Sequence, residues 1–278
     1  MISDDRKVKI LWFLFTLTII IPIIDFILDS FNIFIPFIAI LKFVLPLAIL
    51  LGHSFLLFGP SRSAWLLIPP FVIGFIFEII GVNFGVIFGG NYFYNCSLLG
   101  PSICGVPPLI PFFWSFFVYT GYLITSSFLV WLKIDKPSVQ NKKLGLLFLL
   151  IIIDGLIVVA IDLFMDPVMV ASNYWTWTSR GFYFGIPLGN FFGWFLIAII
   201  SSGIFRIREY FLPLKKITLA ASIWLIPVIG YGGLCLIFLI LAVKLQLGVI
   251  AIIGLAIMLP IVLLNLFLYL RYHYEIRQ

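Results

Sequence analysis

The stretch LGLLFLLIIIDGLIVVAIDLFM, residues 144–165, decides the fold class of this chain. Its only charged side chains are Asp154 and Asp162. About 20 apolar residues, rising about 1.5 Å each in an α-helix, are enough to cross the hydrocarbon core of a bilayer. The stretch therefore predicts a transmembrane helix. Its two acids lie where a carboxylate is costly and usually serves a function.

Seven similar stretches surround this one. The chain has 278 residues, of which 63% are hydrophobic and 10% charged, and its mean hydropathy is +1.24. This composition excludes a soluble protein. We expect an all-α, polytopic integral membrane bundle of eight transmembrane helices, with residues 1–278 forming a single transmembrane domain. The other stretches are residues 10–28, 36–58, 64–89, 107–132, 184–205, 216–241 and 247–270.

The basic residues predict the orientation. Nearly all of the 17 lysines and arginines fall on one side of an eight-span chain. The positive-inside rule then places both termini in the cytoplasm and the aromatic loops 90–106 and 167–183 outside. The net charge of +6 indicates orientation and contact with anionic membrane lipid, since no clustered basic surface points to nucleic acid. We expect a multi-pass protein of the cell membrane.

One pattern occurs twice, on either side of the loop 133–143. It consists of an intramembrane acid, an aromatic loop, Gly-(Val/Ile)-Pro, and a tryptophan seven residues after the proline. Both copies have the same orientation, so they predict two half-sites on one side of the membrane. The first copy has Glu78, Tyr92, Tyr94, Gly105-Val106-Pro107 and Trp114; the second has Asp162, Asp166, Trp175, Trp177, Gly185-Ile186-Pro187 and Trp194.

The acid of the first copy, Glu78, is predicted to share one helical face with Gly74, Gly81 and Gly85. Such a glycine stripe is also typical of close helix packing, which explains the glycines but not the carboxyl group.

In the second copy, Asp166 precedes Pro167, and a helix-ending turn is an equally good interpretation of that pair. Asn190 shares a face with Pro187 and Trp194. Asp154 lies deeper in the same helix as Asp166 and is a further candidate acid.

Other polar residues are expected to be structural. We predict an ion pair between Asp25 and Lys42, and a hydrogen-bonded packing role for His53. Cys96 and Cys104 form either a disulfide or two unpaired thiols, since their spacing is weak support for a metal site.

Carboxyl groups beneath electron-rich rings suit protonation of a carbon-carbon double bond, because aromatic faces stabilise the resulting cation. The two histidines are too far apart in sequence for a di-iron or haem site, and no nucleotide-binding motif occurs. Asp162-x-x-x-Asp166 resembles the magnesium-binding pairs of prenyltransferases, but a second acidic cluster is missing. We therefore expect no metal and no redox cofactor.

These motifs resemble the carotenoid biosynthesis membrane protein family, which includes bacterial γ-carotene hydratases and the archaeal bisanhydrobacterioruberin hydratase. The resemblance covers about residues 50–205 and leaves the first and the last two predicted helices unmatched. One departure is an extra residue in the run from Phe88 to Tyr94.

The resemblance implies a hydratase, a carbon-oxygen lyase, that adds water to a terminal double bond of a long isoprenoid without a cofactor. The implied catalytic candidates are Glu78, Asp162 and Asp166, joined by Asn190. The substrate-binding candidates are Tyr92, Tyr94, Trp114, Trp175, Trp177, Tyr183, Trp194, Gly81 and Gly85.

Two other classes stay open at this point. In a transporter or lipid-binding membrane protein, the same carboxyl groups would relay protons. An isoprenoid cyclase or prenyltransferase would act on a similar substrate without adding water.

Overall fold

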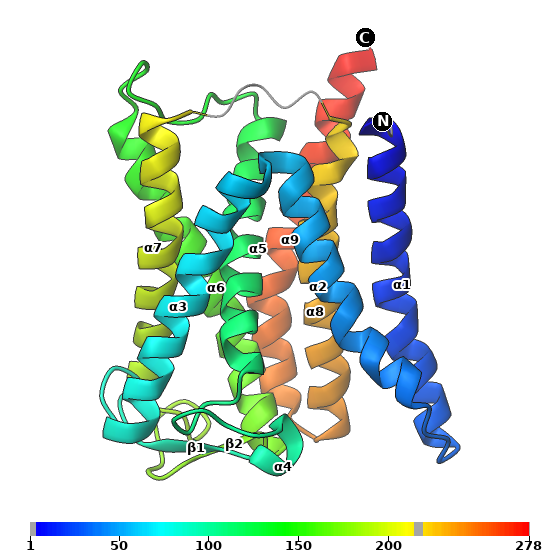
Figure 1. Ribbon diagram of the computed structural model, residues 1–278, viewed down its shortest axis with the longest axis vertical. Helices are drawn as coiled ribbons and strands as arrows, with labels where there is room; N and C mark the ends of the chain where they lie inside the picture. The colour runs from blue at the N-terminus through cyan, green and yellow to red at the C-terminus, as the bar shows by residue number, and fades with distance from the viewer. Residues whose placement is uncertain (1–3, 214–218, 278) are drawn as a thin grey trace. The chain divides into compact units, whose positions relative to one another are not determined.

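The computed structural model describes residues 4–213 and 219–277 (Figure 1). In this part of the chain, eight helices are long and apolar enough to cross a membrane, which confirms the expected all-α, multi-pass fold. They are α1 (Asp4–Ser30), α2 (Pro36–Phe58), α3 (Pro60–Phe84), α5 (Leu109–Trp131), α6 (Leu144–Ala171), α7 (Leu188–Phe211), α8 (Leu225–Lys244) and α9 (Gly248–Arg277).

Short elements complete the described chain. α4 (Cys96–Leu99) follows the strand β1 (Tyr92–Tyr94) in the first aromatic loop, and β2 (Trp175–Trp177) lies in the second. A 3-10 helix, η1 (Ala221–Trp224), leads into α8.

Several helices depart from their predicted ends, and those of α3 and α6 bear directly on the candidate site. α3 stops at Phe84 because Gly85 adopts a φ of +67°, in the left-handed region. α6 runs through Pro167 to Ala171, so the prediction of a helix-ending turn at Asp166 is wrong.

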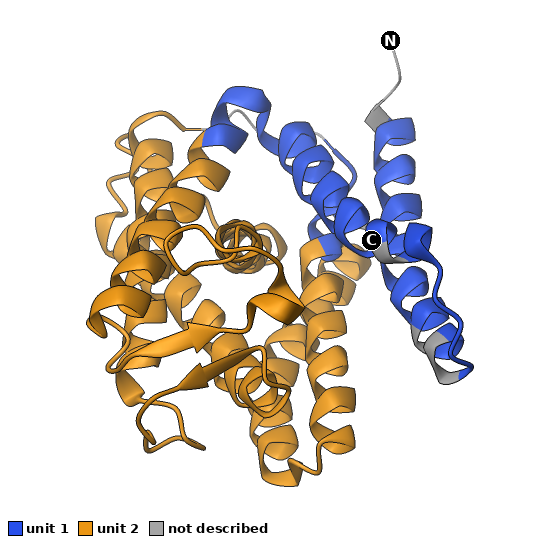
Figure 2. Cartoon of the chain, turned by 60° about the horizontal axis from the view of Figure 1, so that its bottom comes forward, with its two compact units in different colours: residues 1–64, 214–226 blue, residues 65–213, 227–278 orange. Residues whose placement is uncertain are grey.

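The chain divides into two compact units, residues 1–64 with 214–226 and residues 65–213 with 227–278 (Figure 2). In unit 1, α1 packs against α2. The expectation of a single transmembrane domain stays a prediction.

Unit 1 contains two of the predicted structural contacts. Lys42 Nζ donates to Asp25 Oδ2 at 2.5 Å, which confirms the ion pair. His53 is buried, and its Nε2 lies 2.9 Å from the carbonyl oxygen of Ile223, which confirms the packing role.

Unit 2 is built around α6, which packs against α5, α7 and α9. α9 approaches α6 closely because a glycine lies at their contact. A Cβ on Gly254 of α9 would lie 2.1 Å from the Phe164 ring of α6. β1, β2 and α4 lie at one end of this unit, and the loop from 132 to 143 lies at the other (Figure 1). Both aromatic loops are therefore at the same end, as the repeated pattern predicts.

The Gly-(Val/Ile)-Pro motifs form the same turn in both copies. Gly105 and Gly185 have φ of +86° and +91°, which glycine adopts at little cost. Val106 and Ile186 follow and are fully buried. Val106 exchanges backbone hydrogen bonds with Ile103 at 2.9 and 3.0 Å, and Ile186 does so with Tyr183 at 2.9 and 3.1 Å. The motif thus anchors each aromatic loop just before α5 or α7 begins.

Candidate active site

Glu78 of α3 lies at the centre of the first half-site. Its side chain is buried, with a relative exposure of 3%. The hydroxyls of Tyr92 and Tyr94 donate to Oε2 at 2.5 and 2.7 Å, and Trp114 Nε1 donates to Oε1 at 3.0 Å. Both oxygens of this carboxyl group therefore have protein partners. The acid, the two loop tyrosines and the tryptophan of the first copy converge at one point.

The glycines of α3 make room for these side chains. A Cβ on Gly74 would lie 2.4 Å from the Trp114 ring. One on Gly81 would lie 2.4 Å from the Phe88 ring and 3.0 Å from the Tyr92 hydroxyl. Gly85 lies beyond the end of α3, so its expected place on the Gly74–Gly81 helical face is wrong. The glycine face of α3 holds the aromatic residues of the site.

Asp162 and Asp166 lie one turn apart on α6, and both are buried. Asn190 Nδ2 on α7 donates to Asp162 Oδ2 at 2.7 Å and to Asp166 Oδ2 at 2.8 Å. Trp175 Nε1 donates to Asp166 Oδ1. One amide group thus bridges the two carboxyl groups, and an indole of the second loop closes this half-site.

The two half-sites meet through the antiparallel pair of β1 and β2. Tyr92 is the register partner of Trp177 and Tyr94 is that of Trp175. The ring centroids of the first pair are 4.7 Å apart and those of the second 5.9 Å. Tyr94 contacts Glu78 while Trp175 contacts Asp166, so this one ring pair connects the acids of both copies.

Burial affects the loop tyrosines strongly. It raises the pKa of Tyr92 and Tyr94 well above the usual value of 10, and the nearby Glu78 carboxyl group raises both further. Burial also raises the pKa of Tyr183 to about 12, with a contribution from Asp162. The Tyr183 hydroxyl donates to the carbonyl oxygen of Leu163 at 2.9 Å. All three tyrosines are neutral hydrogen-bond donors near neutral pH.

The repeated tryptophans also meet. The ring centroids of Trp114 on α5 and Trp194 on α7 are 4.3 Å apart. Their contact lies among buried apolar residues of unit 2. Together with the rings of β1 and β2, this pair places several aromatic side chains close to the carboxyl groups, and aromatic rings can stabilise a cation by cation-π attraction.

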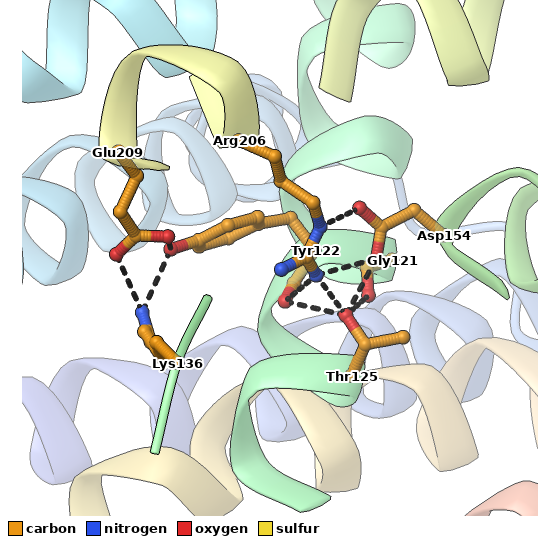
Figure 3. Close-up of polar contacts among 7 residues, drawn as sticks. All are labelled: Gly121, Tyr122, Thr125, Lys136, Asp154, Arg206 and Glu209. Carbon is orange, nitrogen blue, oxygen red and sulfur yellow. Dashed lines mark hydrogen bonds and ion pairs between the residues drawn. The ribbon is translucent and has the colours of Figure 1, made fainter. Parts of the chain in front are cut away.

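A second polar cluster lies deeper in unit 2 and includes the remaining α6 acid, Asp154 (Figure 3). Arg206 of α7 donates to Asp154 through Nε, and through a second guanidinium nitrogen at 2.7 Å. Both side chains are buried. Thr125 of α5 donates to Asp154 Oδ1 at 2.5 Å, and Gly121 lets α5 approach the Asp154 backbone. Asp154 is therefore one half of a buried ion pair.

Tyr122 extends this cluster toward the loop 132–143 (Figure 3). The Arg206 guanidinium lies 4.5 Å from the centre of the Tyr122 ring. The Tyr122 hydroxyl donates to Glu209 at 2.9 Å, and Lys136 donates to Glu209 at 2.7 Å. The sequence analysis ended this helix at residue 205, just before Arg206, whereas α7 continues to Phe211 and so brings Arg206 into the buried cluster.

The loop cysteines do not form a disulfide in the structure. Cys96 and Cys104 are exposed free thiols, which is the unpaired alternative. Within residues 4–213 and 219–277, no three His, Cys, Asp or Glu side chains are grouped so as to hold a metal ion.

The family model for carotenoid biosynthesis proteins matches residues 34–263. The chain belongs to the carotenoid biosynthesis protein family. The match extends beyond the residues 50–205 that carried the resemblance, since it includes α2, α8 and about half of α9. No curated protein and no solved structure was found to match the chain. Membership in this family assigns the chain to carotenoid biosynthesis, and its eight apolar helices make it a multi-pass membrane protein.

Proposed function

We propose that this protein is an integral membrane hydratase that adds water to a terminal double bond of a carotenoid or related long isoprenoid. Membership in the carotenoid biosynthesis family supports an apolar isoprenoid substrate. The eight membrane-spanning helices support a substrate that is dissolved in the bilayer. The product is a tertiary alcohol.

The single observation that carries this proposal is the convergence of three buried acids under paired aromatic rings. Glu78, Asp162 and Asp166 come from two helices and are connected through the Tyr94–Trp175 ring pair. Hydration of an alkene needs a proton donor, a setting that stabilises a tertiary cation, and an acceptor for the proton that water releases. The acids and the rings provide these three functions.

The reaction divides between the carboxyl groups and the aromatic residues. A carboxyl group transfers a proton to the less substituted carbon of the double bond, which leaves the positive charge on the tertiary carbon. The faces of Tyr92, Trp175 and Trp177 stabilise this charge by cation-π attraction, at about 2 kcal/mol or more per ring in a desolvated site. Water then adds to the cation and releases a proton to a carboxylate.

The orientation of the chain is part of the proposal. With both termini in the cytoplasm, the end of unit 2 that carries β1 and β2 faces the outer side of the cell membrane. The acids lie on α3 and α6 near that end. The end group of an extended isoprenoid then meets the acids near the interface, where water is close, while its polyene chain stays in the bilayer.

The test is expression of the chain in a host that accumulates an acyclic carotenoid, followed by mass analysis of the extracted pigments. A product heavier by one water supports hydration. A product of unchanged mass but altered absorption indicates cyclisation, and unchanged pigment across several acyclic isoprenoids contradicts enzymatic turnover. The matched control is a triple variant, Glu78→Gln with Asp162→Asn and Asp166→Asn, which keeps the side-chain shapes.

A further inference from the structure

One carboxyl oxygen at the candidate site differs from the rest. Asp162 is completely buried, and its Oδ1 has no hydrogen-bond partner among the described residues. Its Oδ2 accepts the amide hydrogen of Asn190 at 2.7 Å. Burying a polar atom without a partner costs free energy, and a catalytic role or a bound water is a common reason for such an atom.

The other two acids have no comparable oxygen. Glu78 Oε1 accepts from Trp114, and Oε2 contacts two tyrosine hydroxyls. Asp166 accepts from Asn190 at Oδ2 and from Trp175 at Oδ1. Each oxygen of Asp166 therefore already faces an N–H donor, and neither is free of a described partner.

The bridge through Asn190 also decides where a shared proton belongs. Two buried carboxylates held by one amide group repel each other when both are charged, so the pair retains a proton. At Asp162 the proton fits on Oδ1, because Oδ2 already accepts from Asn190. In that position the proton meets no described hydrogen-bond partner of the protein.

We propose that Asp162 is the catalytic acid of the site and that it acts through Oδ1. This assignment rests on the proposed hydratase function. The O–H bond at Oδ1 breaks as the electron pair of the double bond forms a new C–H bond, which leaves a tertiary cation and an Asp162 carboxylate. Water forms a C–O bond to the cation and releases its proton to Oδ1. Alkene and water thus give one alcohol, and Asp162 regains its proton.

A second unpartnered atom fits the same step. Trp177 Nε1 on β2 is buried and has no hydrogen-bond partner among the described residues. A neutral hydroxyl group needs both a donor and an acceptor, and the site offers an indole N–H as well as the Asp162 carboxylate. Trp177 Nε1 is thus a second buried polar atom of the aromatic loops without a described protein partner.

The experiment compares single variants of the full-length protein in membranes supplied with an acyclic carotenoid. Asp162→Asn is isosteric, and we expect it to lower the hydration rate by about 100-fold or more, the usual contribution of a general acid. Asp166→Asn and Glu78→Gln each cause a smaller loss, because they remove neighbours of the acid. Asp135→Asn, an exposed loop acid, is the matched control with an unchanged rate.

Infrared spectroscopy of the same proteins detects the protonated carboxyl group directly and does not depend on turnover. Its C=O band is expected in the double variant Glu78→Gln, Asp166→Asn, because Asp162 is completely buried there and no donor faces its Oδ1, and the band is lost when Asp162→Asn is added. Absence of the band from the double variant overturns the assignment. This result does not require the Asp162→Asn variant to fold or to be produced. The assignment is also overturned if the wild-type protein hydrates the carotenoid and the Asp162→Asn variant keeps more than about a tenth of that rate. A wild-type protein that does not hydrate contradicts the proposed function, and the infrared result still decides whether Asp162 holds the proton.

Discussion

Tyr92 of β1 and Trp177 of β2 are register partners, and their ring centroids are 4.7 Å apart. This pair belongs to two copies of one sequence pattern, separated by 85 residues in the chain numbering. Its contact, repeated by Tyr94 and Trp175, turns two half-sites into one site.

Tyr92→Phe removes one of the two hydroxyls that donate to Glu78 Oε2. Because Tyr94 still donates to that oxygen, we expect a loss of about 1–2 kcal/mol in unfolding free energy. Thermal unfolding in detergent measures the change. Tyr174→Phe is the matched control in the same region of the chain, since no hydrogen bond of its hydroxyl is present in the described residues; equal losses in both variants would show that the contact with Glu78 contributes nothing.

Gly74→Ala places a Cβ against the Trp114 ring, at 2.4 Å if nothing moves. Overpacking of this kind costs about 1–3 kcal/mol and displaces the indole that donates to Glu78. The free energy of unfolding and the hydration rate are measured together, and both are expected to fall. Gly233→Ala, in the interior of α8 with no atom within 4 Å, is the control and should be neutral or slightly stabilising; similar behaviour of the two variants would rule out a tight Gly74–Trp114 contact.

Arg206→Met leaves the Asp154 carboxyl group buried without its cation. Removing one partner of a buried ion pair costs about 3–5 kcal/mol, because the remaining charge is uncompensated. Adding Asp154→Leu to Arg206→Met should recover most of this loss in a double-mutant cycle. Arg208→Met, at a partly exposed position two residues away, is the control. A coupling energy near zero between Arg206 and Asp154 would be incompatible with the pair.

The alkaline titration of the tyrosines tests the burial of the site. A tyrosine with a raised pKa stabilises the fold fully below its unfolded value of 10 and loses that contribution as the pH rises further. Tyr183→Phe should remove a phenolate that titrates near pH 12. Tyr92→Phe and Tyr94→Phe should remove none near pH 10, because their pKa values lie well above it. The absorbance of phenolate in the folded protein measures these titrations. If Tyr92→Phe or Tyr94→Phe lost a phenolate that titrates near pH 10 in the wild-type protein, the hydroxyl of that tyrosine would be exposed.

Local patterns in the sequence predicted the parts of the fold that depend on composition and spacing. Apolar stretches of sufficient length predicted the eight helices, since only a helix satisfies its backbone groups within lipid. The repeated pattern pointed to Glu78 and Trp114, which are in contact in the structure, and helical spacing pointed to Asn190. Both copies also share one turn geometry at Gly105 and Gly185.

These local patterns did not predict contacts between residues that are far apart in the chain. Arg206 and Asp154 are 52 residues apart, and the predicted helix 184–205 ended just before Arg206. The proline after Asp166 suggested a turn, but tertiary packing carries α6 past it. Gly85 was assigned to a helical face by spacing, although its left-handed φ ends α3 one residue earlier.

The most direct test of the central claim is hydration in water labelled with heavy oxygen. Membranes containing the wild-type protein are given an acyclic carotenoid, and the tertiary alcohol is analysed by mass spectrometry. The account predicts one labelled oxygen in each product molecule and about 100-fold less product with Asp162→Asn. No alcohol, or an alcohol whose oxygen carries no label, would contradict it.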